Sequence, residues 1–559
     1  MKVVVVGGVA AGPKAASKII RMCPEADVTV LEKGAFLSYA GCGLPYYISG
    51  VVKEQKQLMS TTMGGSRDPV FFQKVKNVRV LNRTEAIRID RAKKTVEVKD
   101  LTTGETSSLP YDKLVLATGA QPLIPPIPGV NLKGVFTLHS VEDAEGIKTV
   151  VSQERAKDVA VIGGGLIGVE ITEALVAKGC RVTVLEMLPQ ILPTLDWEMA
   201  RQVQLHMEAK GVKVLTYAEV REIAADSPSG DCAARVKTTA GDCPADMVIL
   251  AVGVRPNVSL AKETGLHIGE TGAIWVDDHL RTSDPDIYAA GDCVECRNVI
   301  TEKPCYVPLG STANKQGRVA AVNICGGDDT FPGVVGSMVC KVFDYAVART
   351  GLSEAEARRA GFDVVTALVP SPDRAHYMPT AKLLMLKLIG DRVSGRLLGA
   401  QATGPGEAAK RIDVAATAII AGMTVDQVAK LDLTYAPPYA PAMDNLITGC
   451  NVMRNKIAGF MVGITPMQLR EKPEGSYFFL DVRSRAEVAE VRLPESANIP
   501  LGALRTRLNE IPHDREIVMF CNISLRAYEA ALILKANGYR DVKVLDGGVV
   551  MWPYEKIVG

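Results

Sequence analysis

The chain carries a strand–glycine turn–helix–strand pattern twice, and this repeat restricts the fold more than any other feature. In the first copy, a β-branched run at residues 3–6 leads into Gly-Gly-Val-Ala-Ala-Gly at 7–12, and the next strand ends on Glu32. Such a turn presents backbone N–H groups at a helix start to a pyrophosphate, and the acid accepts a hydrogen bond from a ribose hydroxyl. Val9 replaces the middle glycine of the usual G-x-G-x-x-G pattern, so this copy alone also fits a structural turn.

The second copy has the full pattern. A strand at 158–162 is followed by glycines at 163, 165 and 168, and the next strand ends on Glu186. No arginine follows Glu186 within a few residues to hold a 2′-phosphate, which favours NADH and leaves NADPH use open. Two complete copies predict two dinucleotides in one chain, and electron transfer from a nicotinamide to a flavin is the simplest explanation.

Length and charge narrow the class of protein further. The 559 residues predict three or four domains, and a net charge of +1 without a basic stripe argues against a nucleic-acid partner. No apolar run is long enough for a transmembrane helix, and the N-terminus lacks the features of a signal peptide. We therefore expect a cytoplasmic protein without membrane insertion, whose twelve cysteines are mostly reduced.

Two further strand ends agree with a flavoprotein, namely Ala117-Thr118-Gly119 and Gly291-Asp292. With the glycine turns they resemble the two-dinucleotide flavoprotein disulfide reductases, the glutathione-reductase-like class. The resemblance covers roughly residues 1–450 and implies FAD in the first copy and NAD(P)H in the second. The cofactor contacts that it implies are Gly7, Gly8, Ala11, Gly12, Glu32, Lys33, Ser38, Ala117, Thr118, Gly119, Gly163, Gly165, Leu166, Ile167, Gly168, Glu186, Gly253 and Asp292.

Cys42 is the predicted redox centre. It lies in the segment Ser-Tyr-Ala-Gly-Cys-Gly-Leu-Pro-Tyr-Tyr at 38–47, where relatives of this class often carry two cysteines five residues apart. Here the residue five positions after Cys42 is Tyr47, so no second local thiol can close that ring. Cys42 is then expected to cycle through a mixed disulfide, a persulfide or a sulfenic acid.

The segment around Cys42 resembles the single-cysteine branch of the class, which contains coenzyme A-disulfide reductases, NADH oxidases, NADH peroxidases and NAD(P)H persulfide or polysulfide reductases. It is most similar to the coenzyme A-disulfide and persulfide group. Residues 9–11 lack the histidine of the peroxidases, which argues against peroxide reduction. Gly41 stands where coenzyme A-disulfide reductases usually have asparagine, so binding of coenzyme A stays open.

The region from about 330 to 450 alternates strands and helices without a glycine turn and resembles the interface domain of the class, which forms a homodimer. By that resemblance Tyr377 and Tyr439 lie near Cys42 of the other subunit, where a phenol could protonate a leaving thiolate. The alternative is that these tyrosines only pack within rigid proline-rich loops. Cys293 and Cys296 form a C-x-x-C with Cys305 downstream, but no second C-x-x-C accompanies them, which favours ordinary buried cysteines over a redox motif or a metal site.

The last hundred residues have a second cysteine of interest, Cys521, which follows a strand and precedes a short loop and a helix. Backbone N–H groups and the positive end of that helix stabilise an anionic sulfur, and Arg526 adds a fixed positive charge. The segments Asp-Val-Arg, Asn-Ile-Pro-Leu, Cys-x-x-x-x-Arg and Asp-Gly-Gly resemble a single rhodanese domain, which implies that Cys521 carries a persulfide. Ser524 departs from the usual glycine of the loop, and a degenerate domain kept for interaction is the alternative.

Together these features predict an α/β fold with two Rossmann-like domains, an α+β dimerisation domain and a C-terminal rhodanese domain. The expected boundaries are 1–112 and 246–327 for the FAD domain, 113–245 for the NAD(P)H domain, 328–450 for dimerisation, 451–465 for a linker and 466–559 for the rhodanese domain. The expected function is NAD(P)H-dependent reduction of a small-molecule persulfide, polysulfide or disulfide through Cys42. The alternatives are an NADH oxidase and a sulfurtransferase or redox-sensing module.

Overall fold

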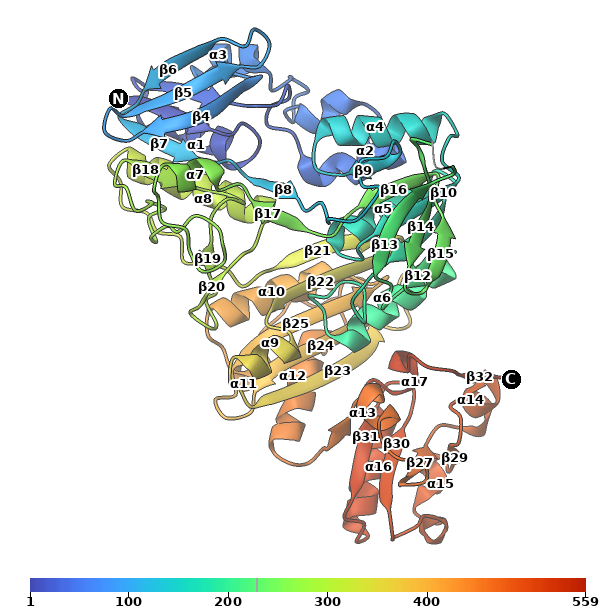
Figure 1. Ribbon diagram of the computed structural model, residues 1–559. Helices are drawn as coiled ribbons and strands as arrows, with labels where there is room; N and C mark the ends of the chain where they lie inside the picture. The colour runs from blue at the N-terminus through green and yellow to red at the C-terminus, as the bar shows by residue number, and fades with distance from the viewer. Residues whose placement is uncertain (228–229) are drawn as a thin grey trace. The chain divides into compact units, whose positions relative to one another are not determined.

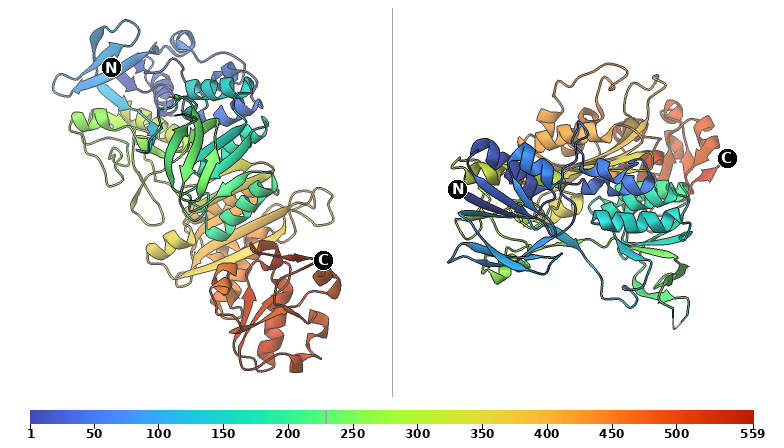
Figure 2. Two further views of the ribbon diagram at one scale, coloured as in Figure 1. Left: turned by 45° about the vertical axis from the view of Figure 1, so that its right-hand side comes forward. Right: turned by 90° about the horizontal axis from the view of Figure 1, so that it is seen from above.

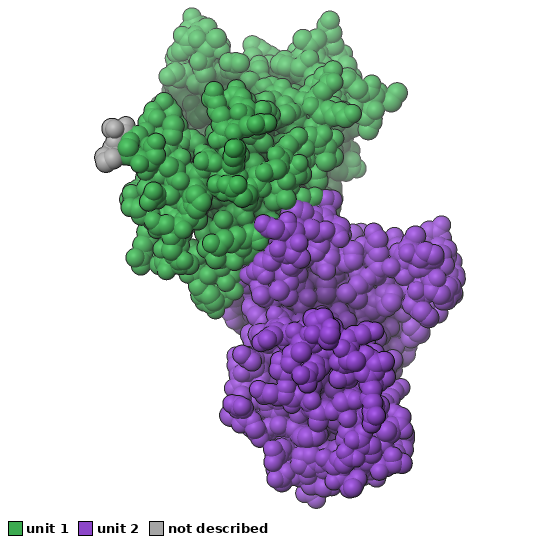
Figure 3. Space-filling view, turned by 90° about the vertical axis from the view of Figure 1, so that its right-hand side faces the viewer, with its two compact units in different colours: residues 1–189, 212–334 green, residues 190–211, 335–559 purple. Residues whose placement is uncertain are grey.

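The computed structural model describes residues 1–227 and 230–559. It divides into two compact units, coloured separately in Figure 3. The first unit contains residues 1–189 and 212–334, and the second contains residues 190–211 and 335–559. Each unit is described by itself.

The first unit is built on two parallel sheets, visible in blue to green in Figure 1. One sheet has the order β18-β7-β1-β2-β3, and its central strand is buried over residues 3–6, as a parallel strand covered on both faces must be. Helices α1 and α8 pack against each other beside it. The bounds are Lys2–Val6 (β1), Asp27–Leu31 (β2), Arg79–Leu81 (β3), Lys113–Leu116 (β7), Ile287–Ala289 (β18), Ala11–Met22 (α1) and Gly310–Ile324 (α8).

The other parallel sheet of this unit has the order β12-β11-β10-β16-β9. Small antiparallel sheets accompany the two parallel ones, with the orders β4-β5-β6 and β13-β14-β15. The bounds of the second sheet and its helices are Val135–Thr137 (β9), Asp158–Ile162 (β10), Arg181–Leu185 (β11), Lys213–Leu215 (β12), Met247–Leu250 (β16), Val141–Ser152 (α4) and Leu166–Val176 (α5). The antiparallel strands are Thr84–Asp90 (β4), Thr95–Asp100 (β5), Thr106–Pro110 (β6), Val220–Ala225 (β13), Ala233–Thr238 (β14) and Gly241–Pro244 (β15).

Strand pairing corrects two of the expected domain boundaries. The boundary between 112 and 113 is wrong because β7 pairs with β1, so residues 113–116 belong to the first sheet. The boundary between 245 and 246 is wrong because β16 pairs with β10, so residues 247–250 belong to the second sheet. In both cases the chain passes from one sheet to the other one strand later than the expected boundary placed the crossing.

The second unit contains an antiparallel sheet of order β21-β22-β25-β24-β23 and, after it, a parallel sheet of order β26-β31-β30-β27-β29. The latter, with its helices, forms the red C-terminal part in Figure 2. The antiparallel part has the bounds Met338–Val342 (β21), Tyr345–Gly351 (β22), Val364–Pro372 (β23), Leu383–Asp391 (β24), Leu397–Gly404 (β25), Ala408–Ile420 (α10) and Asn445–Ile457 (α12). The parallel part has the bounds Gly463–Ile464 (β26), Tyr477–Asp481 (β27), Ala497–Asn498 (β29), Glu516–Phe520 (β30), Val542–Leu545 (β31), Arg485–Glu490 (α14) and Leu525–Ala536 (α16).

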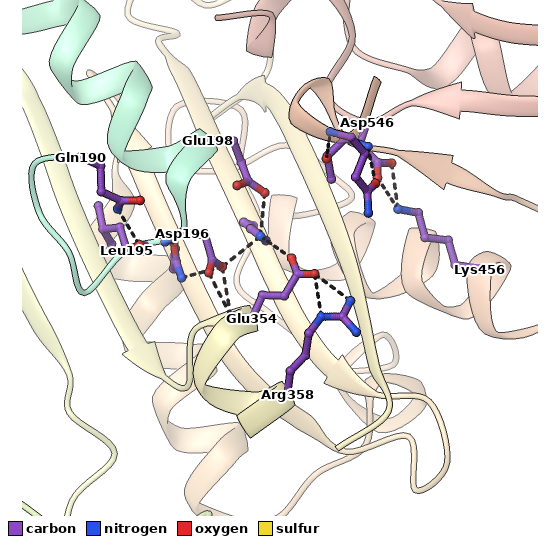
Figure 4. A network of polar contacts seen from close by, with 12 residues as sticks. Gln190, Leu195, Asp196, Glu198, Glu354, Arg358, Lys456 and Asp546 are labelled. Carbon is purple, nitrogen blue, oxygen red and sulfur yellow. Dashed lines mark hydrogen bonds and ion pairs between the residues drawn. The ribbon is translucent and has the colours of Figure 1, made fainter. Parts of the chain in front are cut away.

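Buried ion pairs connect the parts of the second unit, as Figure 4 shows. Lys387 of β24 is almost fully buried, and its Nζ lies 2.6 Å from Glu198 and 3.0 Å from Asp196, two carboxylates of the segment around helix α6 (Trp197–Ala209). Lys456 of α12 contacts both carboxylate oxygens of Asp546, at 2.8 and 2.7 Å. Within residues 1–227 and 230–559, no helix is long and apolar enough to cross a bilayer.

Candidate active site

The first glycine turn lies where β1 ends and is closed by its own packing. Gly7 has φ +114°, and a Cβ there would clash with the carbonyl of Ala117, while a Cβ on Gly12 would clash with the carbonyl of Gly7. Glu32 holds the turn because its carboxylate accepts hydrogen bonds from the N–H groups of Gly8 at 2.7 Å and Gly34 at 2.6 Å. The turn therefore has the shape of a backbone cradle for a phosphate.

Two other predicted residues, Ser38 and Asp292, lie next to this turn. Ser38 donates its backbone N–H to the carbonyl of Gly8 at 2.8 Å. A Cβ on Gly291 would lie 3.1 Å from that of Ala11, so the Gly291–Asp292 turn adjoins the first glycine turn. Burial raises the pKa of the Asp292 carboxyl to about 6, and a buried carboxyl at this position fits a contact with a polar group of the cofactor.

The turn after β7 closes the same edge of the sheet. Thr118 exchanges hydrogen bonds with Asn257, at 2.7 Å through its hydroxyl and at 2.9 Å through its carbonyl, and Gly119 has φ +67°. Lys33 differs from the other predicted residues because its side chain is exposed and pairs with Glu85 at 2.7 Å. The structure thus brings the first glycine turn, the Thr118–Gly119 turn and Asp292 together, while the ammonium of Lys33 is engaged elsewhere.

The second glycine turn repeats the construction of the first. A Cβ on Gly163 would clash with the Ala251 carbonyl and one on Gly168 with that of Gly163, whereas nothing lies within 4 Å of a Cβ on Gly165. The carboxylate of Glu186 accepts the N–H groups of Gly164 at 2.7 Å and Leu188 at 2.8 Å. Leu166 and Ile167 are the first residues of α5, and Gly253, with φ +113°, follows β16. Open space at Gly165 and the N-terminus of α5, which no side chain caps, fit a second pyrophosphate.

Cys42 is exposed and lies in a short 3-10 turn, Gly41–Gly43, that leads into α2 (Leu44–Ser49). Helix α2 packs against α5, the helix that begins at the second glycine turn. The protein atoms around the sulfur desolvate it and raise the pKa of the thiol, and the charges of Glu170 and Asp292 raise it further. The charges of Glu170 on α5 and of Asp292 therefore both disfavour the thiolate of Cys42.

Tyr47 occupies the position where a second cysteine would complete an internal disulfide. Its side chain is buried, and its hydroxyl donates to Glu145 of α4 at 2.6 Å. Lys148 of the same helix places its Nζ 3.6 Å from the centre of the ring. Tyr47 thus anchors α2 to α4 and leaves Cys42 without a neighbouring thiol in this segment.

Tyr377 and Tyr439 are exposed, at 64% and 67%, on two neighbouring loops of the second unit. Arg374 connects these loops, because it donates to the Pro438 carbonyl at 3.0 Å and pairs with Asp373 at 2.9 Å. The two phenols therefore belong to one surface.

Cys521 is only 1% exposed and follows β30 at the start of a tight loop. Ser524 adopts the left-handed conformation, with φ +74°, and its hydroxyl donates to the Leu545 carbonyl at 2.8 Å, so this hydrogen bond helps to hold a conformation that glycine adopts more readily. The carbonyl of Cys521 accepts the N–H of Val549 at 3.0 Å. Hydrogen bonds therefore hold the loop at its start, Cys521, and at its end, Ser524.

Comparison with known proteins agrees with this arrangement. The model of the pyridine nucleotide-disulphide oxidoreductase family matches residues 1–317, its dimerisation domain matches 337–447, and the rhodanese-like domain matches 465–554. The chain belongs to the pyridine nucleotide-disulphide oxidoreductase family.

Three relatives of this oxidoreductase are informative. The NAD(P)H sulfur oxidoreductase (CoA-dependent) of Pyrococcus abyssi is 40% identical over 452 residues, which cover 81% of this chain and 98% of that protein. The structure of an NAD-dependent persulfide reductase from A. fulgidus is 48% identical, with a TM-score of 0.94 over 99% of this chain and 100% of that one. Reduced CoADR-RHD of Bacillus anthracis is 38% identical, with a TM-score of 0.91 over 99% and 97%. The expected fold class, with a rhodanese domain after the oxidoreductase domains, is confirmed.

The structure of this oxidoreductase adds two acidic residues that the sequence analysis missed. Glu170 lies on α5, and its charge raises the pKa of the Cys42 thiol. Burial together with the charge of Glu173 raises the pKa of the Glu170 carboxyl to about 7. Glu487 of α14 accepts two hydrogen bonds from Arg526 and one from Asn522 in the Cys521 loop. Glu170 follows the last glycine of its turn by two residues, a signal that was available, whereas nothing local to Glu487 points to Cys521.

Proposed function

We propose that the protein uses NAD(P)H and FAD to reduce a sulfur–sulfur bond at Cys42, in a persulfide, a polysulfide or a coenzyme A disulfide, and that Cys521 carries sulfane sulfur. The observation that carries the proposal is a single exposed thiol without a partner cysteine in its segment. It leads into helix α2, which packs against the helix of the second nucleotide turn, in a chain that also holds a rhodanese domain. The names of the most similar relatives support the same chemistry.

The residues fit both cofactors. FAD would be held by the turn at Gly7–Gly12, by Glu32, by the Thr118–Gly119 turn and by Asp292, and NADH by the turn at Gly163–Gly168 and by Glu186. When bound, the flavin supplies the relay of two electrons from the nicotinamide to sulfur. No arginine follows Glu186 within a few residues, which supports NADH over NADPH.

Cys42 supplies the sulfur chemistry. Its thiolate attacks one sulfur of the substrate, a new S–S bond forms to Cys42, and the other sulfur leaves as a thiolate that takes up a proton. Two electrons then cleave the bond at Cys42 and release the second thiol, or hydrogen sulfide where the bound group is a sulfane sulfur. We propose that Glu170, whose charge acts on this thiol and whose carboxyl has a pKa of about 7, takes the proton of Cys42 and returns it.

We infer that the protein is a homodimer and that Tyr439 and Tyr377 act on the thiol of the other subunit. The match to the dimerisation domain supports the assembly, and the joint exposure of both phenols supports their role. A phenol can protonate the leaving thiolate while it keeps water away from the sulfur.

The deciding experiment is anaerobic NADH oxidation by the flavin-loaded protein, with coenzyme A persulfide and coenzyme A disulfide as separate substrates. Fast turnover with the persulfide, with sulfide released, is the expected result. Cys42→Ser should abolish it, while Cys232→Ser, at another exposed cysteine, should not. Normal turnover by Cys42→Ser would contradict the proposal.

The same assay separates the rival functions. NADH consumption that requires air and ignores both substrates would identify an oxidase. Thiosulfate:cyanide turnover with negligible NADH turnover would identify a sulfurtransferase or redox-sensing module.

A further inference from the structure

The two cysteines of the C-x-x-C, Cys293 and Cys296, are not paired with each other in the structure. Cys296 is instead opposite Cys305 on a neighbouring strand. Cys293 is fully buried, and its thiol donates to the carbonyls of Leu116 at 3.5 Å and Ala290 at 3.4 Å. Cys296 lies on the short strand β19 (Cys296–Arg297), antiparallel to β20 (Pro304–Cys305), and its register partner is Cys305.

This register places the Cα atoms of the two cysteines at a separation that a disulfide can span. Direct partners in an antiparallel ladder have Cα atoms about 4.5–5.5 Å apart, and disulfides join Cα atoms about 4.4–6.8 Å apart. Both cysteines are reduced in the structure. The described residues contain no cluster of three or more ligating side chains that would make this a metal site.

Hydrogen bonds connect both strands to the Gly291–Asp292 turn of the nucleotide site. Gln316 of α8 donates its Nε2 to the sulfur of Cys296 at 3.3 Å, and its Oε1 accepts the N–H of Gly291 at 2.8 Å. On the other strand, Tyr306 follows Cys305 and donates its hydroxyl to the Asp292 carbonyl at 2.9 Å. Gln316 therefore links the sulfur of Cys296 to the Gly291–Asp292 turn, and Tyr306, the residue after Cys305, links the other strand to it.

We propose that Cys296 and Cys305 form a second redox-active dithiol, separate from Cys42, which low-molecular-weight disulfides convert into an internal disulfide. Cys305 is half-buried and reacts first, and buried Cys296 resolves the product. The sulfur of Cys305 bonds to one sulfur of R–S–S–R, and the other leaves as RSH with the proton of Cys305. Cys296 then attacks the sulfur of Cys305, and a second RSH leaves with the proton of Cys296. Two electrons and two protons pass to the disulfide, and excess thiol reverses both steps.

The surroundings of Cys296 and Cys305 make thiol–disulfide exchange at this pair slow, so it is not a site of rapid turnover. Burial, with the charge of Cys305 as the next cause, raises the pKa of Cys296 to about 12. Burial, with the charge of Glu295 next, raises that of Cys305 to about 11. Both sulfurs are therefore protonated at neutral pH, and exchange proceeds through a small thiolate fraction. Closure changes the sulfur that accepts the hydrogen bond of Gln316 from a thiol to a disulfide, and Gln316 also contacts the Gly291–Asp292 turn.

The test uses the full-length, flavin-loaded protein, reduced, freed of reductant and incubated with oxidised glutathione at mildly alkaline pH. Free thiols are then alkylated and the protein is digested with trypsin, which cleaves after Arg297 and separates the two cysteines. The expected product is a linked pair of peptides, two hydrogens lighter than their sum, that dithiothreitol splits. Two alkylatable thiols after full incubation would overturn the proposal.

Variants fix the identity of the pair. The disulfide between Cys296 and Cys305 should still form in Cys293→Ser and in Cys42→Ser. The first variant matters because Cys293 and Cys296 lie in the same tryptic peptide. The disulfide should be lost in Cys305→Ser and in Cys296→Ala. A link that needs Cys293 would overturn the assignment. Since the peptides are read without any turnover, the result is independent of whether the proposed reductase activity is correct.

Discussion

The guanidinium of Arg526 is paired with the carboxylate of Glu487 through two hydrogen bonds, at 2.6 and 2.8 Å. Arg526 was expected to add a fixed positive charge beside Cys521. Glu487 is the first of the groups that raise the pKa of this guanidinium, and Cys521 is also among them. The same carboxylate accepts a third hydrogen bond, from Asn522 at 2.9 Å. Glu487 therefore positions both Asn522 and Arg526 around the loop that holds the sulfur.

Glu487→Ala should lower thiosulfate:cyanide sulfur transfer by roughly tenfold or more, because the loop loses the partner of both Asn522 and Arg526 and the thiol is no longer held in place. NADH-dependent reduction at Cys42 should keep its rate, as it depends on another cysteine. Glu490→Ala, an exposed acid on the same helix, is the matched control and should change neither activity. Equal loss in both variants would refute the positioning role.

The pH dependence of the same pair has a defined sign. Hydrogen bonding to Arg526 is the largest cause that lowers the pKa of Glu487, from 4.5 to about 2. A lowered pKa in the folded state contributes stability that is present above pH 4.5 and is lost as the pH falls towards 2. We expect acid unfolding of the rhodanese domain to begin at higher pH in Glu487→Gln than in the wild type. Far-UV circular dichroism against pH measures this, and superimposable curves would exclude it.

Glu170→Gln should make Cys42 more reactive above neutral pH. The charge of Glu170 raises the pKa of the Cys42 thiol, and this carboxyl, with a pKa of about 7, is charged only above that pH. Removing the charge lowers the pKa of the Cys42 thiol, so alkylation at pH above 7 should be several-fold faster in the variant. The rate of iodoacetamide labelling of Cys42 measures the effect. Rates should coincide at acidic pH, and exposed Glu105→Gln should leave the whole profile unchanged.

Local pattern predicted the nucleotide turns because glycine turns and β-branched runs are short-range features. The predicted strand at 158–162 coincides with β10. Strand β22, at Tyr345–Gly351, was missed since it mixes small and polar residues. One of these, Arg349, is buried with its guanidinium paired to Glu356 at 2.9 Å and hydrogen-bonded to the Gly351 and Thr194 carbonyls. Glu487 likewise meets Arg526, which lies 39 residues away in the sequence. Cys296 is paired with Cys305 by the register of two short strands. Neither partner follows from a local pattern.

Lys456→Met should loosen the rhodanese domain from helix α12. The variant leaves the carboxylate of Asp546 buried without its cation, and burial already raises the pKa of this carboxyl. We expect several-fold faster tryptic cleavage between residues 458 and 472, while the exposed control Lys430→Met should be cleaved at the wild-type rate. Cleavage at the same rate in both variants would show that this ion pair does not hold the domain.

Lys387→Met should destabilise the second unit strongly. Burial alone would lower the pKa of Lys387, but the carboxylates of Glu198, Asp196 and Glu354 raise it overall, so the ammonium is charged in the folded protein. Removing it leaves three carboxylates facing one another in a buried site, and breaking a buried ion pair costs about 3–5 kcal/mol. We expect the loss in urea unfolding at neutral pH, and a smaller loss near pH 4, where protonation relieves the repulsion. Lys382→Met, an exposed lysine just before the same strand, is the control. A loss of stability that does not shrink in acid would mean that packing rather than charge sets the cost.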